Sequence, residues 1–592
     1  MPSTSFTTYK QLGGKTVSIE QIIDEVKVLP LDGVLGFLGS LSIELVQAGQ
    51  NFGDPRGIQG QNLNYAIVDE FPYKLPNVHK MYIPGRVPVT GGHHLFLHEQ
   101  NIAWLTHLAL LHADRDCTTP ELNYDLRKRI CRLLLIANDF LNFHDDKKVN
   151  NLTDRRGFVL NWLRHWQFNQ YFEHVTSTMM RLSRQWILLN EFLPKYYDIE
   201  TDFIEATNGV CLKRFFEILA VFITHFHNLK PGTHWLSKEK MCSTIKANKN
   251  EIEIITDKWS VTPDQYIIAY DEWNNSRPVK DGNIPYFDYV TLRNTPLIEA
   301  RSGELICPVL PFLLAKIVDG AFFILTDFLN NKDAIKRNKF HQSLGNAYQD
   351  YAHKLIEFIG YHDNKGKWEI EFSPKSKSKN VLIELSDSYL QRGDIAISFE
   401  HKGLRPDTEY LRGGNGNKIL GPDEEVLNKL DSNTSVSYEE GSKNDEGLLT
   451  RGLWQQAKAG KSLISWAEEK FQVRPKIIIP IITNLAHLRV DEVTRGIYLN
   501  PLIEKTKMYS YDFWSKPQWI YIGDLEKLAA IAEEGILDIE KLLTEKNSVY
   551  PDMQFDVFLY QYFKKKNYTL NKLFDTATNF LNDAKGSFWP SL

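Results

Sequence analysis

Residues 385–402 read LSDSYLQRGDIAISFEHK and predict a tight hairpin. Gly393 and Asp394 separate two runs of alternating apolar and polar residues, and glycine at the first position of a two-residue loop is typical of a type II′ turn. If the chain folds back there, Arg392 pairs with Ile395, and each further pair lies one residue farther out on both strands. The pattern therefore fixes which side chains should meet across the hairpin.

This hairpin would bring together residues that could bind a divalent cation. Counting outward places Asp387 opposite Glu400, and directly opposed residues have Cβ atoms about 4.5–5.5 Å apart. Two carboxylates at that distance repel each other unless a positive charge lies between them. Lys402 lies two residues beyond Glu400 and so falls on the same face of the strand. Asp394 also shares that face, but roughly 20 Å of strand separates it from Glu400, so the spacing favours Asp387.

Asp387 followed by Glu400-His401-Lys402 resembles the signature of PD-(D/E)xK nucleases, members of the restriction-endonuclease-like superfamily. A serine precedes Asp387 where that family often has proline. The resemblance implies that Asp387, Glu400 and the backbone carbonyl of His401 bind Mg²⁺, for which Mn²⁺ can substitute. It also implies that Lys402 orients the attacking water, helps to deprotonate it, or offsets the charge on the pentavalent phosphorus. The expected activity is cleavage of phosphodiester bonds, with DNA favoured over RNA by the habit of the superfamily.

Helix-borne residues would support this site if the resemblance extends beyond the hairpin. Many members open the domain with a helix reading G-x-x-F-E-x-Y, whereas residues 345–351 read GNAYQDY. Gln349 therefore replaces the usual glutamate, and Asp350 lies beside it. The family also places a glutamine on a helix after the lysine-bearing strand, and Gln456 is the candidate here, next to Gln455. We expect Gln349, Asp350 and Gln456 to be the supporting residues.

The charge balance limits how nucleic acid could be bound. The formal net charge is −5 over 592 residues, which excludes a protein that coats nucleic acid by bulk positive charge. Contacts with DNA must therefore be local. Lys375, Lys377 and Lys379, in the segment SPKSKSK that precedes the first active-site strand, are candidates for contacts with phosphate groups.

The elements that would position these residues form an α/β pattern with a mixed central sheet. A helix is expected first, then antiparallel strands, a long polar insert, a second helix and further strands. In chain order they are a helix at 342–359, strands at 368–372, 381–390 and 395–400, the insert at 404–446, a helix at 448–470, and strands at 476–483 and 519–522.

The chain as a whole is expected to be an α+β multidomain protein. Helical periodicity predicts an α-rich domain over residues 1–335, which would serve recognition, regulation or assembly through a homo-oligomer or a partner protein. The charged residues 331–339 suggest a linker or a helix end. The nuclease-like domain, with a restriction-endonuclease-like fold, is expected over 336–546, followed by a helical extension over 547–592.

Composition places the chain among ordinary globular proteins. Hydrophobic residues make up 43% and charged residues 24% of the sequence. No apolar run approaches the roughly 20 residues that a membrane helix requires, so no membrane partner is expected. The five cysteines form no CxxC pair, which favours a reducing, cytoplasmic compartment.

Two functions of different classes follow. The first is a Mg²⁺-dependent nuclease, in a combination of domains that looks like prokaryotic defence nucleases directed against phage or plasmids. The alternative is a catalytically inactive protein that keeps the nuclease fold as a binding or scaffold module in a multiprotein complex.

Overall fold

The structure is a computed structural model, and it describes part of the 592-residue chain. The described residues are 5–6, 9–10, 13–52, 94–95, 97, 99–117, 122–141, 175–227, 235–246, 248–276, 289–378, 381–403, 448–485, 500–505, 512–551, 553–566, 568 and 570–583. Lys379 and the predicted insert at 404–446 lie outside the described residues.

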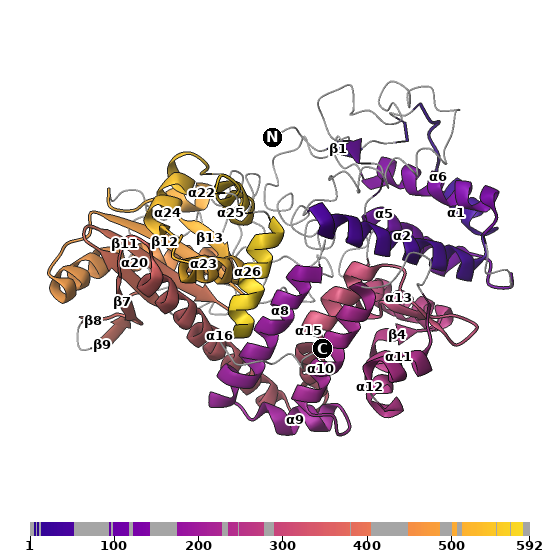
Figure 1. Ribbon diagram of the computed structural model, residues 1–592, viewed down its shortest axis with the longest axis horizontal. Helices are drawn as coiled ribbons and strands as arrows, with labels where there is room; N and C mark the ends of the chain where they lie inside the picture. Colours follow the sequence, from indigo (N-terminus) through magenta and orange to yellow (C-terminus); the bar gives the residue numbers. More distant parts are fainter. Residues whose placement is uncertain are drawn as a thin grey trace. The chain divides into compact units, whose positions relative to one another are not determined.

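The chain forms two compact units whose division does not follow the sequence. Figure 1 labels the helices and strands of both and colours them along the sequence. The first unit comprises residues 1–150, 168–182 and 203–325, and the second comprises 151–167, 183–202 and 326–592. The boundary predicted at residue 335 therefore differs from the observed one. Asp333 caps a continuous helix, α16 (Ala334–His362), by accepting hydrogen bonds from two backbone N–H groups, so the charged segment begins a helix of the second unit.

The first unit is rich in helices, as predicted, and carries one small sheet of four short strands. The sheet order is β3 (Trp235–Leu236), β6 (Leu305–Ile306), β5 (Leu297–Glu299) and β4 (Ser260–Val261). A second pair of strands is β1 (Ser5–Phe6) with β2 (His94–Leu95). Its helices are α1 (Ile19–Val26), α2 (Leu31–Phe52), α5 (Glu99–His112), α6 (Tyr124–Leu141), α10 (Leu212–His227), α11 (Lys238–Ile245), α12 (Lys249–Trp259), α13 (Pro263–Asn275) and α14 (Val290–Asn294).

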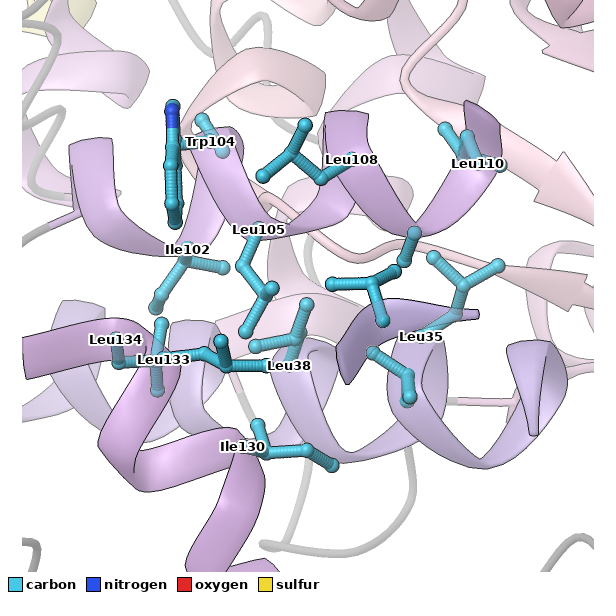
Figure 2. Close-up of a cluster of buried hydrophobic side chains, with 14 of the residues drawn as sticks. Leu35, Leu38, Ile102, Trp104, Leu105, Leu108, Leu110, Ile130, Leu133 and Leu134 are labelled. Carbon is cyan, nitrogen blue, oxygen red and sulfur yellow. The ribbon is translucent and has the colours of Figure 1, made fainter. Parts of the chain in front are cut away.

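Helix α5 lies at the centre of the hydrophobic core of this unit (Figure 2). Nearly every residue of α5 is buried, which is typical of a helix that has neighbours on all sides. Figure 2 shows apolar side chains of α2 and α6 converging on it. The labelled residues are Leu35, Leu38, Ile102, Trp104, Leu105, Leu108, Leu110, Ile130, Leu133 and Leu134.

Three helices cross the division between the units. They are α8 (Val175–Ile187), α9 (Ile199–Ala206) and α15 (Leu310–Lys332). The end of α8 continues into a π-helical turn, η3 (Leu188–Phe192), and a 3-10 turn, η4 (Leu193–Lys195), both in the second unit.

The second unit is a mixed five-stranded sheet with helices around it. Its strands are β7 (Glu369–Phe372), β10 (Ser388–Arg392), β11 (Ile395–Lys402), β12 (Ile477–Asn484) and β13 (Gln518–Tyr521), with a separate ribbon of β8 (Lys375–Ser378) and β9 (Val381–Glu384). Besides α16, its helices are α20 (Leu448–Phe471), α22 (Asn500–Lys505), α23 (Ile522–Glu533), α24 (Ile539–Ser548), α25 (Phe555–Lys564) and α26 (Leu570–Asp583).

The sheet order is β13-β12-β11-β10-β7. Strand β10 is antiparallel to β7 and β11, whereas β11, β12 and β13 run parallel, so the prediction of a mixed sheet is confirmed. The single strand predicted at 381–390 is wrong, because the structure divides it into β9 and β10. Leu385, Ser386 and Asp387 lie at the break between them.

Helices α16 and α20 cover opposite faces of this sheet. A Cβ on Gly360 of α16 would lie 2.6 Å from the Cδ1 of Ile370, so the absence of a side chain allows the helix to approach β7 closely. On the other face, the ring of Tyr389 packs against Trp466 and Phe471 of α20. Alternate residues of β11 therefore face different helices, with Ile397 and Phe399 buried on the α16 side.

None of the helices in the described ranges combines the length and the apolar character that crossing a membrane demands.

Candidate active site

The predicted hairpin register is confirmed from Arg392 to Ser388, whereas the predicted pairing of Asp387 with Glu400 is wrong. Strands β10 and β11 pair from Arg392 with Ile395 to Ser388 with Phe399, in the register obtained by counting outward from the turn. Gly393 has a φ of 61°, in the left-handed region that glycine adopts without strain.

Asp387 lies one step beyond the regular ladder. Its N–H donates to the carbonyl of Phe399 at 3.1 Å, although Ser388 is the ladder partner of that same residue. Two residues therefore face one, which is the pattern of a β-bulge. Oδ2 of Asp387 accepts a hydrogen bond of 2.5 Å from the N–H of His401. The bulge thus directs this carboxylate toward the end of β11 instead of leaving it opposite Glu400.

Ser386 holds the bulge in place. Its hydroxyl lies 2.7 Å from the carbonyl of Ser388, 2.9 Å from the carbonyl of Phe399 and 2.9 Å from the hydroxyl of Ser398. Ser386 is buried, so these contacts replace its hydration. The serine that precedes Asp387 therefore stabilises the bulge in this chain.

Glu400 and Lys402 form a buried ion pair on the face that α20 covers. The Nζ of Lys402 donates to Oε1 of Glu400 at 2.7 Å and to Oε1 of Gln455 at 2.5 Å. The two charged side chains are only 6% and 10% exposed. The pairing keeps the ammonium group next to the carboxylate that the resemblance implies as a metal ligand.

The surroundings of Asp387 disfavour the ionised form of its carboxyl group. Burial, followed by the nearby charge of Glu400, raises its pKa from 3.8 to about 7, while Lys402 and the N–H of His401 act in the opposite direction. The negative charge of Glu400 therefore opposes ionisation of Asp387. A site of this kind gains more from a bound cation than an exposed pair would.

The side chain of His401 lies on the other face and anchors the strand. Its Nε2 is 2.8 Å from the hydroxyl of Ser388, and its Nδ1 is 2.6 Å from the hydroxyl of Thr483, which in turn accepts a hydrogen bond from Tyr348. Burial lowers the pKa of His401 well below its usual value, with His353 and Lys402 adding to the shift. This histidine is therefore neutral, and its role in the site is through its main chain.

The main-chain groups of His401 point toward Asp387. The carbonyl of Lys402 accepts a hydrogen bond from the N–H of Leu485, which follows β12. The main-chain groups of Lys402 therefore point toward β12. Successive residues of a strand direct their N–H and C=O groups to opposite edges. The carbonyl of His401 therefore lies on the same edge as its N–H, which contacts Asp387.

Helix α16 contributes Gln349 and a residue that the sequence did not reveal. Nε2 of Gln349 lies 3.4 Å from Oδ1 of Asp387, and Nε2 of His353 lies 3.0 Å from the Asp387 carbonyl oxygen. His353 is four residues after Gln349, and this spacing on a helix, which places both on one face, is the signal that could have identified it.

Asp350 does not join the site. Its carboxylate accepts hydrogen bonds from the hydroxyl of Tyr196 at 2.9 Å and from Lys195 at 3.3 Å. Adjacent residues on a helix are about 100° apart around its axis, so Gln349 and Asp350 face different neighbours. The hydrogen bonds of Asp350 are therefore directed to residues 195 and 196, and its charge acts on His353.

The adjacent glutamines of α20 have different partners. Gln456 is buried and contacts Ser398, accepting from its hydroxyl at 2.8 Å and donating to its carbonyl at 3.2 Å. Its described hydrogen bonds do not include the carboxylates of Asp387 or Glu400, so Gln456 supports strand β11 at Ser398. Gln455, which accepts from Lys402, is the glutamine at the site.

The predicted phosphate contacts lie on the ribbon of β8 and β9. Lys375 is exposed and pairs in register with Glu384, and Lys377 pairs with Leu382. The base of the ribbon joins the site, because the N–H of Ser373 donates to the Asp387 carbonyl at 2.9 Å.

The donor set suits a hard cation. Within the residues that the structure describes, no group of three or more His, Cys, Asp or Glu side chains is placed to hold a metal ion. What is present is two carboxylates, from Asp387 and Glu400, and the carbonyl of His401. Mg²⁺ prefers oxygen ligands and is commonly held by one or two carboxylates with water completing the shell. The residues therefore fit Mg²⁺ bound with several waters.

Comparison of the chain with protein-family models, with curated proteins and with solved structures gives no match.

Proposed function

We propose that the chain is a Mg²⁺-dependent nuclease of the PD-(D/E)xK type, with a restriction-endonuclease-like fold in its second unit. One observation supports the proposal: Oδ2 of Asp387 accepts a hydrogen bond from the N–H of His401, the residue that separates Glu400 from Lys402, and those two side chains form a buried ion pair. DNA is the proposed substrate.

Each residue then has a defined part in hydrolysis. Asp387, Glu400 and the carbonyl of His401 would hold the ion. When bound, Mg²⁺ supplies charge stabilisation for the scissile phosphate and a more acidic water. Lys402 orients that water from its position between Glu400 and Gln455. Gln349 and His353 keep Asp387 in place through its side chain and its carbonyl.

Recognition of the substrate is proposed to be local. The exposed Lys375 and the neighbouring Lys377 lie on a ribbon whose base bonds to Asp387. A two-stranded ribbon has the dimensions of a DNA groove, and lysines on it can neutralise phosphates. This arrangement is consistent with the negative net charge of the chain. Defence against phage or plasmids is the proposed biological setting.

A second candidate is an inactive nuclease fold that binds partners. It is favoured by Gln349, which stands where the family usually has glutamate and donates to Asp387 rather than adding a third carboxylate. The ion pair between Lys402 and Glu400 would also be stable without a metal.

Cleavage of DNA by the purified full chain separates the two candidates. We expect supercoiled plasmid to be cut with Mg²⁺ or Mn²⁺ and not with EDTA, and Asp387→Asn, Glu400→Gln or Lys402→Ala to lower the rate by roughly 10²-fold or more. Lys476→Ala is the matched control, because Lys476 pairs with an aspartate, Asp394, at the exposed turn of the same hairpin.

Two results would contradict the proposal in different ways. Metal-dependent cleavage that survives both Asp387→Asn and Lys402→Ala would place the active site elsewhere. Absence of cleavage of any DNA or RNA by the wild-type chain would favour the binding or scaffold function.

A further inference from the structure

Asn484, the last residue of β12, lies beside the lysine of the proposed site. In the parallel pairing of β11 and β12, Glu400 is the partner of Ile482 and Lys402 is the partner of Asn484. Partners in a parallel ladder direct their side chains to the same face. That face is the one covered by α20, since a Cβ on Gly452 of α20 would lie 3.0 Å from the Cδ1 of Ile482. Asn484 therefore shares the face of Glu400 and Lys402.

The amide of Asn484 is buried without a complete set of partners. The residue is 1% exposed, and its Oδ1 is enclosed and accepts no hydrogen bond from the described part of the chain. A buried acceptor left unpaired costs about 1–3 kcal/mol, so native structures rarely keep one without a use. The carboxyl ends of parallel strands, where Asn484 and Lys402 lie, are also where α/β sheets bind ligands.

We propose that Asn484 is a further residue of the active site, whose amide oxygen accepts a hydrogen bond from the water that attacks the phosphate. This inference rests on the proposed nuclease function and adds a residue that the sequence pattern did not indicate. Lys402 already donates to two oxygens, which leaves it one N–H to offer a water and no acceptor to fix the direction of that water's O–H groups. An acceptor on the neighbouring strand orients the water by one of its O–H groups and leaves a lone pair directed at phosphorus.

The proposed step is the hydrolysis of a phosphodiester bond by one water molecule. The water oxygen forms a new bond to phosphorus while the bond from phosphorus to the leaving sugar oxygen breaks. One proton of the water is released to the solvent, and the leaving oxygen takes a proton from the solvent. Asn484 holds the other O–H and undergoes no chemical change.

Three variants of the full chain test this role. Asn484→Leu removes the acceptor at similar volume, and Asn484→Asp keeps an oxygen in the same place. Gln391→Met is the matched control, because Gln391 is a buried amide of the same sheet at the end that carries the hairpin turn. Its side chain accepts a hydrogen bond from Tyr389 and donates to the carbonyls of Gly393 and Val473, so its oxygen and its nitrogen both have partners. The measurements are the single-turnover cleavage rate over a range of Mg²⁺ concentrations, DNA affinity without divalent metal, and the unfolding temperature in EDTA.

We expect Asn484→Leu to lower the maximal single-turnover rate roughly 10²-fold. DNA affinity and the Mg²⁺ concentration for half-maximal rate should stay unchanged, and Asn484→Asp should recover at least tenfold of the loss. The unfolding temperature of Asn484→Leu should equal or exceed that of the wild type, because the substitution removes an unpaired buried acceptor. Gln391→Met should show the reverse pattern, a lower unfolding temperature and an unchanged rate.

Several outcomes would overturn the inference. A rate within threefold of the wild type for Asn484→Leu would remove Asn484 from the reaction. An unfolding temperature that falls as it does in Gln391→Met would assign a structural role. A tenfold rise in the Mg²⁺ requirement at an unchanged maximal rate would make Asn484 a metal ligand instead. If the wild-type chain cleaves no nucleic acid, the proposed nuclease function fails first and this inference falls with it.

Discussion

At the scale of single residues, the site contains a carboxyl group, that of Asp387, whose ionised form is energetically unfavourable. The half-buried Asp387 carries a pKa of about 7 because of burial and the charge of Glu400, so its ionisation at neutral pH opposes folding. Active sites commonly contain groups of this kind, since the interaction with substrate or metal repays their cost. Gln349 and the N–H of His401 hold the side chain in position despite that cost, and His353 holds the main-chain carbonyl.

Asp387→Asn should stabilise the metal-free protein at high pH. A carboxyl group whose pKa is raised on folding binds more protons in the folded state, so stability falls as pH rises from about 4 to above 7. We therefore expect a higher unfolding temperature than wild type at pH 8 in EDTA, and no difference near pH 4. Thermal unfolding monitored by circular dichroism measures both.

The control for this prediction is Asp394→Asn. The pKa of Asp394 is lowered by its hydrogen bond and ion pair with Lys476, so its removal should give no gain at pH 8. A loss of stability in Asp387→Asn at pH 8 would contradict the electrostatic account.

Gln349→Glu should strengthen metal binding. The Gln349 amide is 3.4 Å from Oδ1 of Asp387, so a glutamate there adds a third carboxylate to the site. We expect a several-fold lower Mg²⁺ concentration for half-maximal cleavage, together with a lower unfolding temperature in EDTA because of the added repulsion. Isothermal titration with Mn²⁺ gives the affinity independently of activity.

Asp350→Asn is the neighbouring control, because Asp350 contacts Tyr196 and Lys195 instead of the site. An unchanged metal affinity in Gln349→Glu would show that Gln349 is too far from the ion to matter.

At the scale of elements, two helices and a bulge convert a hairpin into a site. The bulge at Asp387 moves its carboxylate to the end of β11, and α16 fixes it there. Helix α20 presents Gln456 to the middle of β11 and Gln455 to its end, so one turn of helix both supports the strand and contacts Lys402.

The two glutamines should therefore give separable effects. Gln456→Leu removes the two buried hydrogen bonds to the hydroxyl and the carbonyl of Ser398 and should lower the free energy of unfolding by about 1–3 kcal/mol. Gln455→Ala, at an exposed position, should change it by less than about 0.5 kcal/mol but slow cleavage through Lys402. Urea unfolding and plasmid cleavage measure the two quantities. Equal losses of stability in both variants would refute this division of roles.

At the scale of the whole molecule, the second unit depends on residues from an early part of the chain. Arg184 is buried, donates to both oxygens of Glu526 at 2.5 and 2.6 Å, and contacts the hydroxyl of Tyr521. Tyr351 donates to the same glutamate at 2.6 Å. The ion pair thus joins the end of α8 to α23 and α16, which explains why residues 183–202 pack with the second unit.

Arg184→Met should destabilise the second unit strongly. Removing one partner of a buried ion pair leaves an uncompensated charge and costs about 3–5 kcal/mol. Arg181→Met is the matched control on the same helix, because its ion pair with Asp319 is partly exposed and should cost less. Chemical unfolding followed by tryptophan fluorescence and by DNA cleavage compares them. Equal effects of the two substitutions would contradict a special role for the buried pair.

The sequence by itself determined the local features. Alternation and a glycine at the turn specified the hairpin register from Arg392 to Ser388, because a strand has a period of two and the turn fixes its phase. Hydrophobic periodicity likewise specified the helix preceding the sheet and the buried strand β12. The candidate residues Asp387, Glu400 and Lys402 follow from these local patterns.

Only the tertiary structure decided what lies near what across the chain. The bulge at Asp387, the choice of Gln455 over Gln456 and the buried Asn484 depend on how helices and strands pack, and residue spacing within one element carries no such information. The membership of Arg184 in the second unit depends on an ion pair between residues more than 300 positions apart. Local spacing does not specify such pairs, because burial and partner geometry together decide their stability.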